Sequence, residues 1–94
     1  MATMIVKHKV ADYNKWKSVF DEMKTTRLSH GWVGHEVHRD AADSNTVVII
    51  NKMKTIEGAK AYGQSPELKE AMQRGGVISV PEIQLLNDEE LVSY

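Results

Sequence analysis

The sequence predicts a single α+β domain whose elements follow the order strand, helix, strand, strand, helix, strand. Two patterns indicate this order. Residues 4–10, 32–39, 46–53 and 82–86 read as strands, with β-branched residues most frequent in 4–10 and 46–53, and the segments 13–28 and 56–74 carry apolar residues at helical spacing. A chain of 94 residues can bury one hydrophobic core, so we expect one domain over 1–94. The order is typical of a ferredoxin-like sandwich, in which one four-stranded antiparallel sheet carries its helices on one face.

The first strand and the first helix are predicted from their periodicities. Residues 4–10 alternate in character, which places His8 on the same face as Val6. Asp12 is a suitable N-cap, and we expect one helix of about four turns that ends near Gly31. Its apolar stripe consists of Trp16, Val19, Phe20, Met23 and either Arg27 or Leu28.

A hairpin follows, with strands at 32–39 and 46–53 and a polar loop at 40–45. The loop lacks the glycine and the closing glutamate of a calcium loop, so we interpret it as a solvated turn. The second strand is apolar at four consecutive positions, 47–50, so both of its faces require burial. Helices cover only one face, and we therefore expect a homodimer that buries the other. The alternative is a hydrophobic central strand in a monomer.

Two shorter helices are expected before the last strand. Thr55 is placed to cap the first, which carries Tyr62. Ser65, followed by a proline, is placed to cap the second, and Gly75 to end it. Residues 82–86 then supply the fourth strand, which completes the sheet.

Composition excludes several classes of function. The chain has 12 Lys and Arg against 13 Asp and Glu, a net charge of −1, so it lacks the basic patch of a nucleic-acid or anionic-membrane binder. The absence of cysteine excludes disulfides, thiolate metal sites and cysteine nucleophiles. No apolar run has the length of a signal peptide or a membrane span, and we expect a cytoplasmic protein. A small organic molecule and a second copy of the chain are the expected partners.

Two segments carry a resemblance to a known family. Residues 6–21, VKHKVADYNKWKSVFD, and residues 65–77, SPELKEAMQRGGV, resemble small members of the dimeric α+β barrel superfamily that are related to the antibiotic biosynthesis monooxygenase group. The resemblance implies a ferredoxin-like protomer and a two-fold dimer. It also implies a cavity, between sheet and helices or between the two sheets, where characterised relatives bind aromatic polyketides, haem or other small organic molecules.

The resemblance also bears on cofactors and on substrate-binding residues. Haem-degrading relatives use a histidine on the second helix with a tryptophan nearby, and residues 55–76 contain neither, so we expect no haem and no other cofactor. Cofactor-independent monooxygenase relatives hold an aromatic substrate with Asn, Trp and Tyr side chains. Asn51, Trp32 and Tyr62 are of these types, and the resemblance makes them candidate substrate-binding residues.

The histidines offer further candidates. His8 lies mid-strand and could act as a catalytic base near neutral pH; the alternative is a core histidine satisfied by one hydrogen bond. His35, Glu36 and His38 have the residue types of a metal site, but strand positions three apart point to opposite faces, so we expect no metal there. Glu36 and His38 share a face and are candidate substrate-binding residues.

Two functions stay open at this point. The first is a small-molecule site in the dimeric barrel, used by a cofactor-independent monooxygenase or isomerase on a small organic or aromatic substrate. In this hypothesis His8 is the base, and Asn51, Trp32 and Glu36 position the substrate. The second is a non-catalytic module that uses its open sheet face only for association. A polar hollow favours the first, and a cavity filled by aliphatic side chains favours the second.

Overall fold

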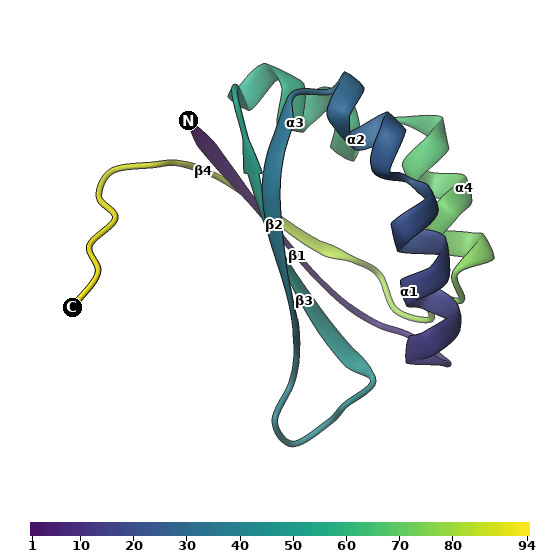
Figure 1. Ribbon diagram of the computed structural model, residues 1–94. Coiled ribbons are helices and arrows are strands. Elements are labelled where there is room, and N and C mark those ends of the chain that lie inside the picture. The colour runs from purple at the N-terminus through teal and green to yellow at the C-terminus, as the bar shows by residue number, and fades with distance from the viewer.

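The computed structural model describes residues 1–94 and contains one four-stranded sheet with helices on one face (Figure 1). The strands are β1 (Ala2–Lys9), β2 (Trp32–Arg39), β3 (Thr46–Met53) and β4 (Glu82–Asn87). They follow the order β2-β3-β1-β4, and every neighbouring pair is antiparallel. The helices are α1 (Tyr13–Glu22), α2 (Lys24–Ser29), α3 (Ile56–Gly63) and α4 (Pro66–Arg74). The expected ferredoxin-like α+β protomer is confirmed.

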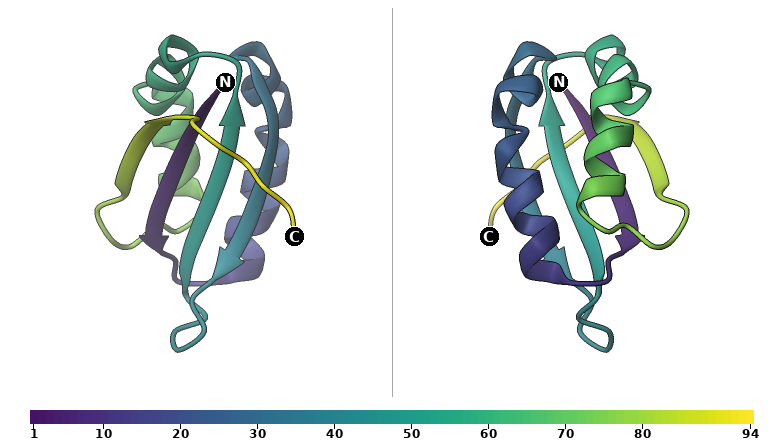
Figure 2. Two further views of the ribbon diagram at one scale, coloured as in Figure 1. Left: turned by 90° about the vertical axis from the view of Figure 1, so that its left-hand side faces the viewer. Right: turned by 90° about the vertical axis from the view of Figure 1, so that its right-hand side faces the viewer.

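The other face of the sheet is open. Figure 2 shows this face in its left view, where no helix lies in front of the strands and the C-terminal segment crosses them, and the helices in front of the sheet in its right view. The chain after β4 leaves the sheet on its open side (Figures 1 and 2). None of the helices combines the length and the apolar character that crossing a membrane requires.

The first predicted helix is in fact two helices, α1 and α2, separated at Met23. The backbone of Met23 has φ −83° and ψ 5°, so its amide bonds back to the Phe20 carbonyl at 3.2 Å in a tight final turn. The same carbonyl also accepts a hydrogen bond from the Arg27 guanidinium. As a result Arg27 faces inward and is 4% exposed, whereas Leu28 is 60% exposed.

The three expected helix caps are confirmed. The Asp12 carboxylate accepts hydrogen bonds from two backbone amides in the first turn of α1. The Thr55 hydroxyl accepts one from the Gly58 amide of α3 at 2.9 Å, and the Ser65 hydroxyl one from the Leu68 amide of α4 at 3.1 Å. These side chains satisfy amides that the helices leave unpaired, which fixes where each helix begins.

The core lies between the sheet and the helices. In the β1–β3 ladder, Val6 is opposite Ile49 and His8 is opposite Val47, and all four point toward the helices and are buried. Because side chains alternate along a strand, the next set points to the open face. That set includes the half-buried aliphatic residues Ile5, Val48 and Ile50. The helices therefore cover the 47/49 face of β3, and its 48/50 face is the one that they leave open.

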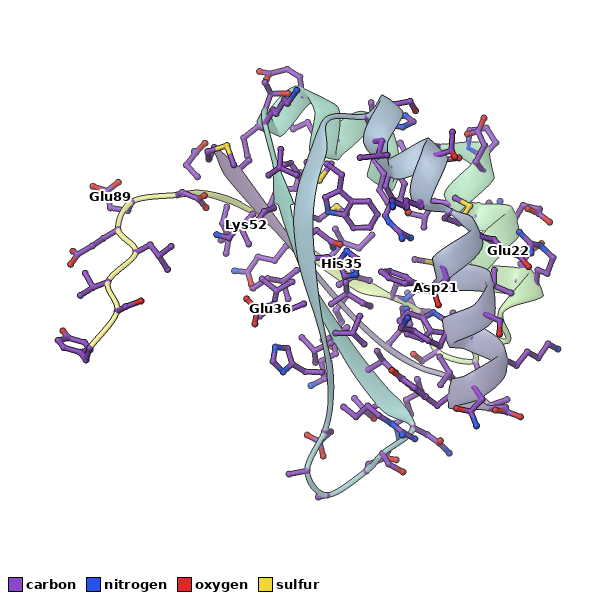
Figure 3. All side chains as sticks on the ribbon, viewed as in Figure 1. Asp21, Glu22, His35, Glu36, Lys52 and Glu89 are labelled. Atoms are coloured by element: carbon purple, nitrogen blue, oxygen red, sulfur yellow. The ribbon has the colours of Figure 1, made fainter.

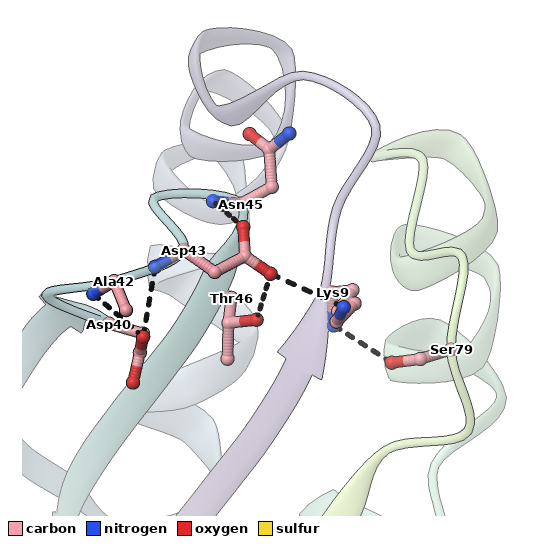
Figure 4. A network of polar contacts seen from close by, with 7 residues as sticks. All are labelled: Lys9, Asp40, Ala42, Asp43, Asn45, Thr46 and Ser79. Atoms are coloured by element: carbon pink, nitrogen blue, oxygen red, sulfur yellow. Dashed lines mark hydrogen bonds and ion pairs between the residues drawn. The ribbon is translucent and has the colours of Figure 1, made fainter.

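Two aspartates of the loop between β2 and β3 stabilise its conformation by accepting hydrogen bonds from nearby residues. Asp40 accepts hydrogen bonds from two loop amides, both at 2.9 Å, and Asp43 accepts one from the Thr46 hydroxyl at 2.9 Å (Figure 4). Asp43 also pairs with Lys9 of β1 at 3.3 Å. Hydrogen bonds from the Asn45 amide and from Thr46 hold the pKa of Asp43 below its usual value. Nowhere in the chain do three or more His, Asp or Glu side chains converge as metal ligands would.

Candidate functional site

A small cavity, which we call the helix–sheet cavity, lies between the sheet and the helices and encloses a free space of about 40 Å³. This space accommodates about two or three water molecules. Four of the six candidate site residues line it, namely His8, Trp32, Asn51 and Tyr62. The remaining wall is apolar and includes three methionines, Met4, Met23 and Met72. The fold thus brings together candidates from β1, β2, β3 and α3.

The other two candidates, Glu36 and His38, lie on the open face of the sheet. Glu36 is opposite Ile50 and His38 is opposite Val48, and the two side chains contact each other at 3.0 Å. The side chain of His35 points to the opposite face of the sheet, where its ring packs on Phe20 of α1 (Figure 3). The alternation of β2 therefore places the sheet itself between Glu36 and the helix–sheet cavity. The expected grouping of Glu36 with the cavity residues does not occur within one chain.

His8 is enclosed in an apolar setting. Its side chain is 3% exposed, and its Nδ1 atom has no hydrogen-bond partner in the protein. Burial lowers the pKa of His8 from its usual value, because removal from water disfavours the charged imidazolium. The ring is therefore neutral at neutral pH, with one nitrogen able to donate a hydrogen bond and the other able to accept a proton.

Asn51 presents a hydrogen-bond acceptor to the cavity. Its amide nitrogen donates to the Met4 carbonyl at 3.0 Å, directly across the β1–β3 ladder. This bond sets the orientation of the amide, because the flipped group would place two oxygens against each other. The carbonyl oxygen of Asn51 is buried and has no partner in the protein. It is thus free to accept a hydrogen bond from a bound molecule.

Trp32 and Tyr62 form an aromatic wall, with 5.1 Å between ring centroids. A register shift between Trp32 and Gly34 lets Trp32 and His35 both face the helices. The indole N–H of Trp32 is buried without a partner. Burial raises the pKa of Tyr62, so its hydroxyl stays protonated at neutral pH, and it interacts with the guanidinium of Arg27.

The buried polar atoms without a partner all belong to this site. The chain has three such side-chain atoms, Nδ1 of His8, Nε1 of Trp32 and Oδ1 of Asn51, and all three residues line the helix–sheet cavity. Each buried group of this kind costs about 1–3 kcal/mol of stability, and native proteins keep few of them. Their concentration in one cavity indicates a site that binds a polar-substituted molecule or ordered water.

Arg27 is a buried residue next to the cavity that the sequence did not single out as a candidate site residue. The guanidinium lies over the rings of Phe20 and Trp32, at 4.1 and 4.4 Å from their centroids. The one signal in the sequence was its helical spacing from Trp16 and Phe20, which fitted Arg27 and Leu28 equally well. The charge of Arg27 gave no reason to expect it in the core, where the structure places it.

Comparisons with known proteins identify the fold. By sequence, the chain matches no protein-family model and no curated protein. By structure, it is similar to SnoaB, a cofactor-independent oxygenase from Streptomyces nogalater, with a TM-score of 0.77 and 17% identity over 99% of this chain and 97% of that one. The expected likeness to the antibiotic biosynthesis monooxygenase group is thus confirmed for the fold.

Two further structures support the same assignment. A proposed antibiotic biosynthesis monooxygenase from Bordetella bronchiseptica has a TM-score of 0.76 and 11% identity over 97% of each chain. Another from Caulobacter crescentus has a TM-score of 0.74 and 16% identity over 95% of this chain and 90% of that one. Because the similarity covers nearly the whole of every chain, the shared fold is that of the complete domain.

Proposed function

We propose that the helix–sheet cavity binds a small planar organic molecule that carries a hydroxyl and a carbonyl group, and that the protein acts on it as a cofactor-independent oxygenase. The three partnerless polar atoms of the cavity carry this proposal. The Trp32 indole donates to the carbonyl oxygen of such a molecule, and the Asn51 oxygen accepts from its hydroxyl. The aromatic and methionine wall packs on its flat faces.

In this proposal His8 is the base. Its neutral imidazole takes a proton from an acidic CH₂ group of the bound molecule, and the electron pair left behind is delocalised onto the carbonyl held by Trp32. Molecular oxygen is the oxidant: the carbanion adds O₂, and loss of water from the resulting hydroperoxide leaves a carbonyl, so that CH₂ and O₂ become C=O and H₂O. The oxygenase function given for SnoaB, which has the same fold, supports this reaction class.

The second candidate function is a non-catalytic association module, which the small free space of the cavity favours. An organic molecule fits only if the wall yields. The flexible side chains of Met4, Met23 and Met72 are the part of the wall best able to do so. If they do not move, water alone satisfies the three polar atoms and the cavity is structural.

We also propose that the chain forms a homodimer through the open sheet face. That face carries the aliphatic residues Ile5, Val48 and Ile50 at its centre. Charges of both signs surround them, with Lys7 and Lys52 on the inner strands and Glu36 and Glu82 on the outer strands. A two-fold axis through such a face can set opposite charges against each other while the aliphatic centre is buried.

The oxygenase proposal is tested with 1,8-dihydroxyanthrone, which carries hydroxyl groups, a carbonyl and an acidic CH₂. We expect the protein to bind it and to accelerate O₂ uptake together with formation of the quinone. His8→Gln should reduce the rate about 100-fold, in the range of general-base effects. Glu57→Gln changes an exposed residue of α3 that lines neither the cavity nor the open face, and as the matched control it should keep the wild-type rate.

Calorimetric titration separates the two candidate functions. Binding with catalysis lost in His8→Gln supports the oxygenase. Binding with an unchanged rate in His8→Gln removes His8 as the base. No binding of the anthrone to the folded protein supports the association module and contradicts the proposed function.

A further inference from the structure

Arg27 is a buried cation without an acidic partner. Its residue is 4% exposed, and none of the ion pairs of the chain includes it. Its protein contacts are the Phe20 carbonyl, the Tyr62 hydroxyl and the faces of Phe20 and Trp32. Arginine is seldom buried to this degree without a paired acid, because removing its charge from water is costly.

The contacts of Arg27 leave part of its hydrogen-bonding capacity unused. A guanidinium has five N–H groups, and here they reach one backbone carbonyl and one hydroxyl. Burial lowers the pKa of Arg27, and the Tyr62 hydroxyl and the nearby charge of Asp21 oppose this shift only in part. None of the Arg27 nitrogens is among the buried unpaired atoms of the chain, so the unused donors are accessible from the groove that Arg27 lines, where an acceptor from outside the chain can reach them.

Arg27 lines an open groove of about 410 Å³ between the helices and the edge of β2, which we call the β2-edge groove. Lys24 contributes a second positive charge to it, and Trp32 and Leu28 contribute apolar surface. The acid in the groove, Asp21, is already paired with Lys17 at 2.6 Å. The groove is thus positively charged around an apolar floor.

We propose that the β2-edge groove binds the carboxylate of a small organic acid. The flat fork of the Arg27 guanidinium matches the two oxygens of a carboxylate, and Lys24 adds a second positive charge. Trp32 and Leu28 contact the hydrocarbon body of the acid. Trp32 lines both this groove and the helix–sheet cavity, but His8 and Asn51 do not line the groove, so the proposal stands whether or not the cavity is a substrate site.

His35 is a further polar group of the groove. Burial and the nearby charges of Arg27 and Lys17 lower the pKa of His35, so it is a neutral imidazole near pH 7. A neutral imidazole can donate one hydrogen bond to an anion. Its position between Phe20 and Trp32 places it on the apolar side of the groove.

Titration with benzoate, followed by amide and side-chain NMR signals, tests the site. We expect saturable shifts of the Arg27 Nε–H and of the Leu28 and Gly34 backbone amides, which line this groove and not the helix–sheet cavity. Benzamide, which has the same shape without the charge, should give none. Arg27→Gln should weaken benzoate binding by about 10-fold or more, as expected for loss of a charge-assisted hydrogen bond. Arg74→Gln removes an arginine that pairs with Glu22 and Glu70 elsewhere, and it should bind as the wild type does.

A second variant keeps the test valid if Arg27→Gln does not fold. Lys24→Gln alters an exposed residue of the same groove, and we expect benzoate binding that is about threefold weaker and less sensitive to salt. Equal shifts with benzamide, wild-type affinity in both groove variants, or shifts centred on His8 would each overturn the proposal. Inorganic phosphate that binds as tightly as benzoate would overturn the assignment to an organic acid.

Discussion

The imidazole of His8 meets the indole of Trp16 edge to face, with 5.6 Å between the ring centroids and 70° between the ring planes. This contact joins β1 to α1 across the helix–sheet cavity, which both residues line. It holds the imidazole against an aromatic surface instead of a hydrogen-bonding group. The protonation of His8 is therefore linked to the stability of the fold.

Stability should decrease as the pH falls below the ordinary histidine range. Above about pH 6.5, His8 is neutral in both the folded and the unfolded chain. Below it, the unfolded chain binds a proton that the folded chain resists, because the folded pKa is lowered. Urea unfolding between pH 7.5 and about pH 5 should thus show a steeper loss in the wild type than in His8→Gln. Parallel pH dependences would contradict the link. His35, whose pKa is also lowered, is present in both proteins.

Replacing His8 with Phe should keep or raise the stability. The change removes a buried nitrogen that has no partner, and a ring of similar shape stays in contact with Trp16. His8→Ala, by contrast, should lose about 2 kcal/mol or more, because it leaves a larger cavity. Thermal unfolding of the two variants measures the difference. A strongly destabilised His8→Phe would show that the imidazole is hydrogen-bonded in solution.

The two faces of β3 should respond differently to a buried charge. Ile50→Asp lies on the open face and should separate the proposed dimer into folded monomers. Ile49→Asp lies in the core at 3% exposure and should unfold the chain, because an unpaired carboxylate there costs several kcal/mol. Light scattering and circular dichroism distinguish these outcomes. A wild-type chain with the mass of one protomer at micromolar concentration would contradict the dimer.

Two glycines of α3 form a matched pair. A Cβ at Gly58 would lie 2.6 Å from the His30 carbonyl oxygen, so Gly58→Ala forces the backbone to shift and should cost about 1–3 kcal/mol. At Gly63 the nearest atom is the sulfur of Met4 at 3.8 Å, an ordinary contact, and Gly63→Ala should be neutral or stabilising by up to about 1 kcal/mol. Denaturant midpoints of the two variants test this contrast. Equal midpoints would show that α3 moves freely against the α2–β2 turn.

Local patterns in the sequence determined the protomer fold and most element boundaries. The strands at 32–39 and 46–53 have the predicted ends, because the polar loop at 40–45 separates them and turn or helix-capping residues bound them on the other side. The caps at Asp12, Thr55 and Ser65 also follow from local chemistry, since each side chain bonds to amides within a few residues.

Only the tertiary structure decided what depends on contacts between distant residues. The alternation of β2 showed that Glu36 and His38 share a face, but both faces of the neighbouring β3 are apolar, so the pattern could not say which one the helices cover. The choice between Arg27 and Leu28 was equally open. It depends on the Phe20 carbonyl and the Trp32 ring, which accept Arg27 once the chain is folded. The three partnerless polar atoms have the same origin, because the lack of a partner is a property of the packed structure and not of any one segment.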